Sequence, residues 1–136
     1  MYAVDVGVGQ LLGRLRVDLR VVNLEGTNLA HLSPHLVPDP VDLLTLDLSY
    51  LALADAIPHL DGLRISRDAD LVMLVKPTFE LRRGTLAATP GDVAEATGRA
   101  ARAAERADWQ VTKTCAAPAT GQHGAHETFI HARRPK

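Results

Sequence analysis

With 136 residues, 46% of them hydrophobic and 23% charged, the chain is long enough for one folded domain with a single core, and this composition excludes a disordered protein. The formal net charge of −1 leaves it without the basic footprint of a general nucleic-acid binder, and the single cysteine, Cys115, excludes an internal disulfide. The most apolar segment, 43–54, is interrupted by Asp47 and is shorter than the ~20 residues that span a bilayer. Together with the lack of a signal-peptide pattern, these features predict a cytoplasmic protein.

Strand and helix patterns alternate along the chain. In chain order they predict a strand at 2–6, a helix at 9–18, strands at 20–25 and 41–47, a helix at 50–63, a strand at 70–76, a polar, mobile loop at 82–90, a helix at 90–107, and strands at 109–114 and 127–133. The run at 41–47 is apolar enough to be covered on both faces of a sheet. The alternation predicts an α/β fold with a mainly parallel, doubly wound sheet.

Polar residues lie at the ends of the predicted strands. They are Asp5, Glu25 with Asn28, Asp47, Lys76 and, at the start of the last strand, Glu127. A single charged residue at a strand end is usually only solvated, but ligands of such sheets bind outside the carboxyl ends of the strands. The set therefore predicts a functional site at this edge. A zinc site built from Cys115 and the "HGAH" segment at 123–126 is disfavoured, because structural zinc takes four ligands.

Four segments carry a resemblance to a known family. They are "YAVDVGVGQLLGRLRVDLRVVNLEGTNLAHL", "DLLTLDLSYLAL", "LVMLVKPTFE" and "GQHGAHETFI". In order and spacing they resemble the catalytic domain of the TlyA (hemolysin A) family, FtsJ-type rRNA 2'-O-methyltransferases that use S-adenosylmethionine. The resemblance implies a Rossmann-like class I methyltransferase sheet, mostly parallel with an antiparallel last strand. It also implies ribosomal RNA or a ribosomal subunit as partner, a cytidine-type target, and no metal or membrane.

The resemblance implies roles for the residues at the strand ends. FtsJ-type enzymes surround the acceptor ribose hydroxyl with a Lys-Asp-Lys-Glu set, and Asp47, Lys76 and Glu127 match its last three members. Asp5 resembles the acidic residue that binds the ribose hydroxyls of the cofactor, and Asn28 resembles the position that contacts its adenine. Asp47 is expected to border the cofactor as well.

Parts of the family pattern have no match in the 136 residues. They are the first strand with its glycine-rich cofactor turn, the first lysine of the set, and the small N-terminal RNA-binding domain. Thr78 and Ala125 also replace the usual residues beside Lys76 and Glu127. We therefore expect 1–136 to be a partial catalytic domain that is impaired in methyl transfer and prone to aggregation by itself. The alternatives are a non-catalytic remnant serving as a binding or assembly module and, less favoured, a haemolysin-like factor.

Overall fold

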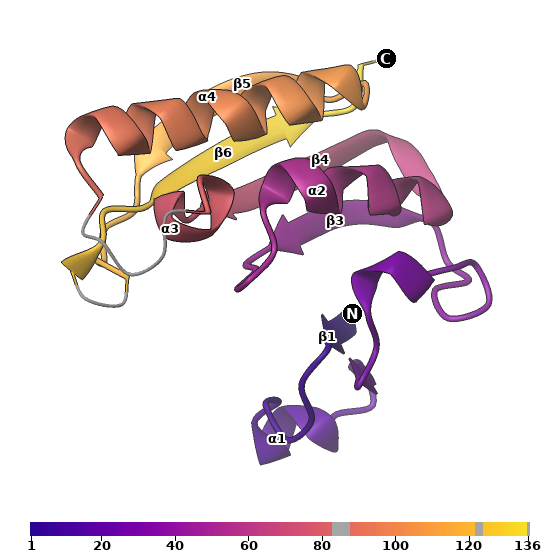
Figure 1. Cartoon of the computed structure of the whole chain (residues 1–136). Coiled ribbons are helices and arrows are strands. Elements are labelled where there is room, and N and C mark those ends of the chain that lie inside the picture. Colours follow the sequence, from indigo (N-terminus) through magenta and orange to yellow (C-terminus); the bar gives the residue numbers. More distant parts are fainter. Residues whose placement is uncertain (83–87, 122–123, 136) are drawn as a thin grey trace. The chain divides into compact units, whose positions relative to one another are not determined.

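The computed structural model describes residues 1–82, 88–121 and 124–135 (Figure 1). The chain forms two compact units. Unit 1 comprises Met1–Pro40 and His59–Arg64, and unit 2 comprises Val41–Pro58 and Ile65–Lys136. The predicted loop at 82–90 falls largely on residues 83–87, which lie outside the described residues.

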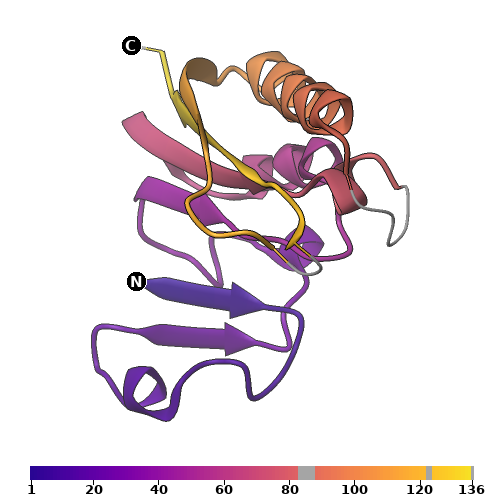
Figure 2. The same ribbon diagram turned by 90° about the vertical axis from the view of Figure 1, so that its left-hand side faces the viewer.

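Unit 1 is built on two parallel strands, β1 (Tyr2–Asp5) and β2 (Val22–Glu25), which lie side by side in Figure 2. Between them α1 (Gly13–Arg16) forms a single turn, and the 3-10 turn η1 (Leu29–His31) follows β2. The helix predicted at 9–18 is therefore much shorter than expected. It has no side-chain cap and no buried residue, so neither capping nor packing extends the turn.

Unit 2 contains a four-stranded sheet of order β3-β4-β6-β5. Its strands are β3 (Val41–Leu46), β4 (Ile65–Val75), β5 (Gln110–Ala116) and β6 (Thr128–Arg133). β3 and β4 are parallel, whereas β6 is antiparallel to both of its neighbours. The predicted α/β class with an antiparallel last strand is thus confirmed.

The helices α2 (Leu53–Ala56) and α4 (Pro90–Arg106) lie on the same face of this sheet (Figure 1). The helix predicted at 50–63 is divided into α2 and the 3-10 segment η2 (Ile57–Gly62), since Pro58 has no N–H to continue an α-helix. The short helix α3 (Pro77–Glu80) was not predicted; Pro77 occupies its first turn, where the missing N–H costs nothing.

The core of unit 2 lies between the sheet and these helices. In the second part of β4 every second residue is fully buried, namely Ala69, Leu71, Met73 and Val75. On β3, Leu44 and Leu46 are buried, whereas Leu43 is 59% exposed. The expectation that β3 is covered on both faces is therefore wrong, because the helices of unit 2 gather on a single face.

Candidate active site

The ends of β3 and β4 bring Asp47 and Lys76 together. The two strands are parallel, with Leu46 opposite Met73, so the residues that follow them emerge at the same edge of the sheet. Lys76 Nζ lies 2.6 Å from Asp47 Oδ1, and the Lys76 side chain is only 18% exposed while that of Asp47 is 70% exposed. Lys76 Nζ also donates a long hydrogen bond of 3.4 Å to Ser49 Oγ, a contact that sequence reasoning missed.

Glu127 joins this pair from the start of β6. Thr128 pairs with Val75, so the antiparallel register brings the residue before β6 beside the residue after β4. Burial raises the pKa of the Glu127 carboxyl; the ammonium of Lys76 lowers it and the carboxylate of Asp47 raises it. Asp47, Lys76 and Glu127 therefore form one electrostatically coupled group, hereafter the DKE cluster.

A buried carboxylate, Glu80, supports the loop between Asp47 and α2. It is 1% exposed and accepts hydrogen bonds from the N–H groups of Leu53 (2.7 Å) and Ala54 (3.3 Å) at the start of α2. Arg99 Nε of α4 lies 3.6 Å from it, and burial raises the pKa of Glu80. Glu80 ends the "LVMLVKPTFE" segment, but its role depends on a contact across 27 positions that no local pattern reports.

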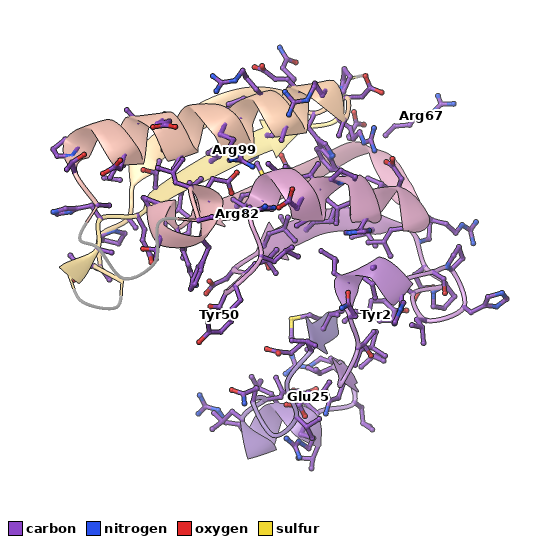
Figure 3. All side chains as sticks on the ribbon, in the orientation of Figure 1. Tyr2, Glu25, Tyr50, Arg67, Arg82 and Arg99 are labelled. Carbon is purple, nitrogen blue, oxygen red and sulfur yellow. The ribbon has the colours of Figure 1, made fainter. Side chains whose placement is uncertain are left out.

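Tyr50, three positions after Asp47, is 91% exposed (Figure 3). Its φ of 66° lies in the left-handed region, which a bulky residue rarely adopts. The ring is tilted against that of Phe79, with 5.2 Å between centroids. An aromatic pair of exposed Tyr50 and half-buried Phe79 thus follows the ends of β3 and β4. The "DLLTLDLSYLAL" segment contains Tyr50, yet the exposure and the positive φ of this residue are visible only in the structure.

Asp5 and Asn28 lie in unit 1, where Asp5 ends β1 and Asn28 follows β2. Asp5 Oδ1 accepts a hydrogen bond from the Gly7 N–H at 2.7 Å, and Asn28 Oδ1 accepts one from the Ala30 N–H at 2.9 Å. Both residues are exposed. The parallel pairing of Asp5 with Glu25 places the loops that follow both strands at one edge of this small sheet.

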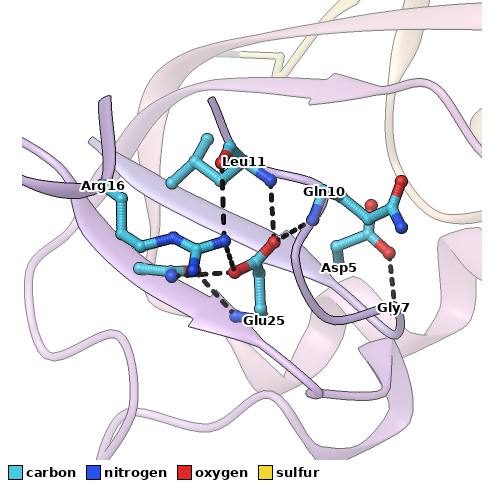
Figure 4. Close-up of polar contacts among 7 residues, drawn as sticks. Asp5, Gly7, Gln10, Leu11, Arg16 and Glu25 are labelled. Carbon is cyan, nitrogen blue, oxygen red and sulfur yellow. Dashed lines mark hydrogen bonds and ion pairs between the residues drawn. The ribbon is translucent and has the colours of Figure 1, made fainter. Parts of the chain in front are cut away.

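Glu25 organises the loop after β1 (Figure 4). Its Oε1 accepts hydrogen bonds from the N–H groups of Gln10 (2.5 Å) and Leu11 (2.7 Å), while Oε2 is bound by Arg16 (2.9 Å) and Asn23 (3.0 Å). The side chain is only 7% exposed. These bonds, those from Asn23 and Leu11 first, lower the pKa of Glu25 to about 2. Glu25 is thus a structural anion that shapes the segment carrying Asp5.

Within 1–82, 88–121 and 124–135, no group of three or more His, Cys, Asp or Glu side chains is arranged to hold a metal ion. His123 of the "HGAH" segment lies outside the described residues. None of the helices in the described part of the chain has both the length and the apolar character that crossing a bilayer requires.

Comparison with known proteins connects this geometry to a family. The profile of the FtsJ-like methyltransferase family matches residues 1–134. The 16S/23S rRNA (cytidine-2'-O)-methyltransferase TlyA of Mycobacterium tuberculosis is 42% identical over 138 residues, which cover 96% of this chain and 50% of that relative. The chain therefore spans about half the length of this curated relative.

Solved structures resemble this chain in fold. A Streptococcus thermophilus protein described as a hemolysin superposes with a TM-score of 0.90 at 26% identity, covering 99% of this chain and 50% of that one. The N-methyltransferase NodS of Bradyrhizobium japonicum, at 14% identity and a TM-score of 0.60, covers 99% of this chain and 73% of its own, and shares the fold alone. The match along nearly the whole chain shows that this protein belongs to the FtsJ-like methyltransferase family, with TlyA among its relatives.

Proposed function

We propose that this chain transfers a methyl group from S-adenosylmethionine to a ribose 2'-hydroxyl of ribosomal RNA, with a cytidine as the target. The observation that carries the proposal is the DKE cluster, in which the Lys76 ammonium lies 2.6 Å from the Asp47 carboxylate. The similarity to a cytidine-2'-O-methyltransferase along 96% of the chain supports this choice of substrate. Ribosomal RNA or a ribosomal subunit is then the partner, and the cytoplasm is the place of action.

The DKE cluster suits the acceptor side of such a reaction. The 2'-oxygen forms a bond to the methyl carbon while the carbon–sulfur bond breaks and leaves its electron pair on sulfur. The bound cofactor supplies the electrophilic methyl group. The hydroxyl proton passes to a base, and the raised pKa of Glu127 makes its carboxylate a better proton acceptor near neutral pH than an ordinary one. Lys76, held by Asp47, donates a hydrogen bond that orients the 2'-oxygen and stabilises its developing charge.

Asp5, Asn28 and Asp47 are the residues that we propose for the cofactor. Among the contacts of the described residues, only Oδ1 of Asp5 is engaged, so Oδ2 is available to the vicinal hydroxyls of a ribose. Asn28 likewise uses its Oδ1 within the loop, which leaves the amide N–H groups to donate to an adenine nitrogen. Asp47 is 70% exposed and pairs with Lys76 through Oδ1. These donors and acceptors fit the polar groups of S-adenosylmethionine.

The exposed ring of Tyr50 fits a role in stacking on the base of the acceptor nucleotide. Sequence-specific recognition of RNA commonly stacks an unpaired base on an exposed aromatic side chain. Tyr50 is 91% exposed, and its positive φ costs free energy that a purely structural loop would avoid. We infer that this strain is retained because it presents the ring to the base of the nucleotide being methylated.

Variants of the full-length protein test which of these residues act on the acceptor hydroxyl and which bind the cofactor. Lys76→Ala and Asp47→Ala should each abolish methylation of ribosomal RNA, because both groups act on the acceptor hydroxyl. Lys76→Ala should leave the affinity for S-adenosylmethionine nearly unchanged, and Asp47→Ala should weaken it less than Asp5→Ala does, because Asp47 is already paired with Lys76. Asp5→Ala should weaken cofactor binding by about 1.5–3 kcal/mol, the usual loss for a charged hydrogen bond.

Calorimetric titration with S-adenosylmethionine and transfer of a labelled methyl group to ribosomal RNA measure the two properties. Asp61→Ala, which changes an exposed carboxylate of unit 1, is the matched control. Equal losses of cofactor binding in all three variants would contradict the assignment. Full methylation by Lys76→Ala would favour a non-catalytic role for the DKE cluster.

A further inference from the structure

The backbone of Gly121, in the connection between β5 and β6, passes directly against the carboxyl group of Glu127. A Cβ placed on Gly121 would overlap Oε1 of Glu127 and would lie 2.7 Å from its Cδ. A Cβ atom essentially never lies closer than 3.0 Å to a heavy atom of a residue that is not its chain neighbour. Any other residue at position 121 therefore requires the Glu127 carboxyl to move.

Backbone hydrogen bonds hold the connection in this place. The Ala117 N–H donates to the Glu127 carbonyl at 2.9 Å, and the Gly121 N–H donates to the Ala125 carbonyl at 2.8 Å. Both bonds tie the connection to the residues just before β6. The close approach to Glu127 is thus built into the turn.

The conformation of the turn does not itself require glycine at 121. Gly124, in the same connection, has a φ of +74° and supplies the left-handed residue. Gly121 lies outside that region, so an alanine there would be free of backbone strain. The contact with Glu127 is what distinguishes the position.

We propose that Gly121 is a positioning residue for Glu127: its missing side chain leaves the space in which the carboxyl group faces Lys76 and Asp47. The proposal rests on the proposed function, in which that carboxyl group accepts the proton of the 2'-hydroxyl. Lys76 and Asp47 both act on the pKa of Glu127, so the carboxyl group lies within their electrostatic reach. The carboxyl group ends a flexible side chain, and Gly121→Ala therefore moves it without disrupting the fold.

Gly121→Ala in the full-length protein tests the proposal through kinetics. We expect kcat for methyl transfer to fall by about a hundredfold, as displacements near 1 Å do in active sites, while the Kd for S-adenosylmethionine is unchanged. Gly91→Ala is the matched control, since its Cβ would meet Thr89 Oγ1 at an ordinary 3.7 Å. In a Glu127→Ala background, Gly121→Ala should cause no further loss of the residual activity. Equal fold-losses in the two backgrounds would overturn the proposal.

A second measurement does not depend on activity. At a compatible backbone conformation, Gly→Ala stabilises a protein by restricting the unfolded chain. Gly121→Ala should therefore raise Tm more in the Glu127→Ala background, where the carboxyl group is gone, than in the wild type. Equal shifts of Tm would show that the two residues do not interact. If the wild-type protein does not methylate RNA, the proposed function fails, and this comparison still decides whether Gly121 positions Glu127.

Discussion

Glu25 is a nearly buried carboxylate that receives bonds from two backbone N–H groups and two side chains. Because these partners favour the ionised form, they lower its pKa to about 2 from the ordinary 4.5. A carboxyl group with a depressed folded-state pKa stabilises the fold above its unfolded pKa, and this contribution is lost as the pH falls through the folded value. The stability that Glu25 gives to unit 1 should thus be complete above pH ~4.5 and decline towards pH ~2.

We predict that the amide resonances of Gln10 and Leu11 report this titration. In the wild type their NMR shifts should change with a midpoint at a pH of about 2. In Glu25→Gln the change should vanish, and the loop after β1 should open more readily because the amide binds Arg16 less strongly than a carboxylate does. Glu105→Gln, at an exposed position of unit 2, is the control. A midpoint near 4.5 in the wild type would contradict the assigned hydrogen bonds.

At the scale of elements, α4 packs on the sheet through a stripe of small residues. Ala96, Ala100 and Ala104 are fully buried, and the helix contacts β4, β5 and β6. A capping box starts it: Thr89 Oγ1 accepts from the Asp92 N–H at 3.2 Å, and Asp92 Oδ2 accepts from the Thr89 N–H at 2.9 Å. The short side chains let the helix axis approach the sheet closely, so this contact has no room for larger residues.

We predict that Ala100→Leu destabilises unit 2 by about 1–3 kcal/mol, the usual cost of overpacking a core. Ala94→Leu is the matched control, because Ala94 is an exposed position of the same helix and the two residue types have similar helix propensities. Urea denaturation followed by the fluorescence of Trp109, which is 1% exposed, measures both. Equal midpoints for the two variants would show that α4 does not pack as described.

At the scale of the whole molecule, the two units differ in how their strands are supported. β4 has a hydrogen-bonded neighbour on each side, and its alternate residues from Ala69 to Val75 are fully buried. β1 and β2 have only each other among the described residues, and Val4 and Val22 are 36% and 43% exposed. A two-stranded sheet is at best marginally stable by itself.

We therefore predict that native-state hydrogen exchange is faster in β1 and β2 than in β4 and β6. A difference on the order of a hundredfold is expected, because local opening of a weakly packed segment needs far less free energy than global unfolding. NMR-detected exchange measures both sets of amides in one sample. Similar protection throughout would show that unit 1 has support beyond its own two strands.

The expectation that residues 1–136 aggregate by themselves stays a prediction.

The local pattern of apolar and polar residues was sufficient to predict much of the fold. Every predicted strand is present, because apolar runs and their turn residues act over short distances. The start of β4 was wrong, since this strand begins at Ile65 and not at 70. The family was also predicted correctly from short segments, and the matching profile over 1–134 confirms it. The lengths of α1 and α2 were wrong, since capping and packing, not propensity, decide how far a short helix extends.

By itself the sequence predicted an α/β fold with polar residues at its strand ends, since hydrophobic period is a property of neighbouring residues, and its resemblance to the TlyA family implied a methyltransferase sheet. The resemblance had grouped three of these residues, and only the tertiary structure shows how they meet. Asp47, Lys76 and Glu127 form the DKE cluster because β4 pairs parallel to β3 and antiparallel to β6, a register set by distant backbone hydrogen bonds. The hydrogen bonds of Glu80 to the start of α2 and the contact of Gly121 with Glu127 likewise arise from close packing between separate segments.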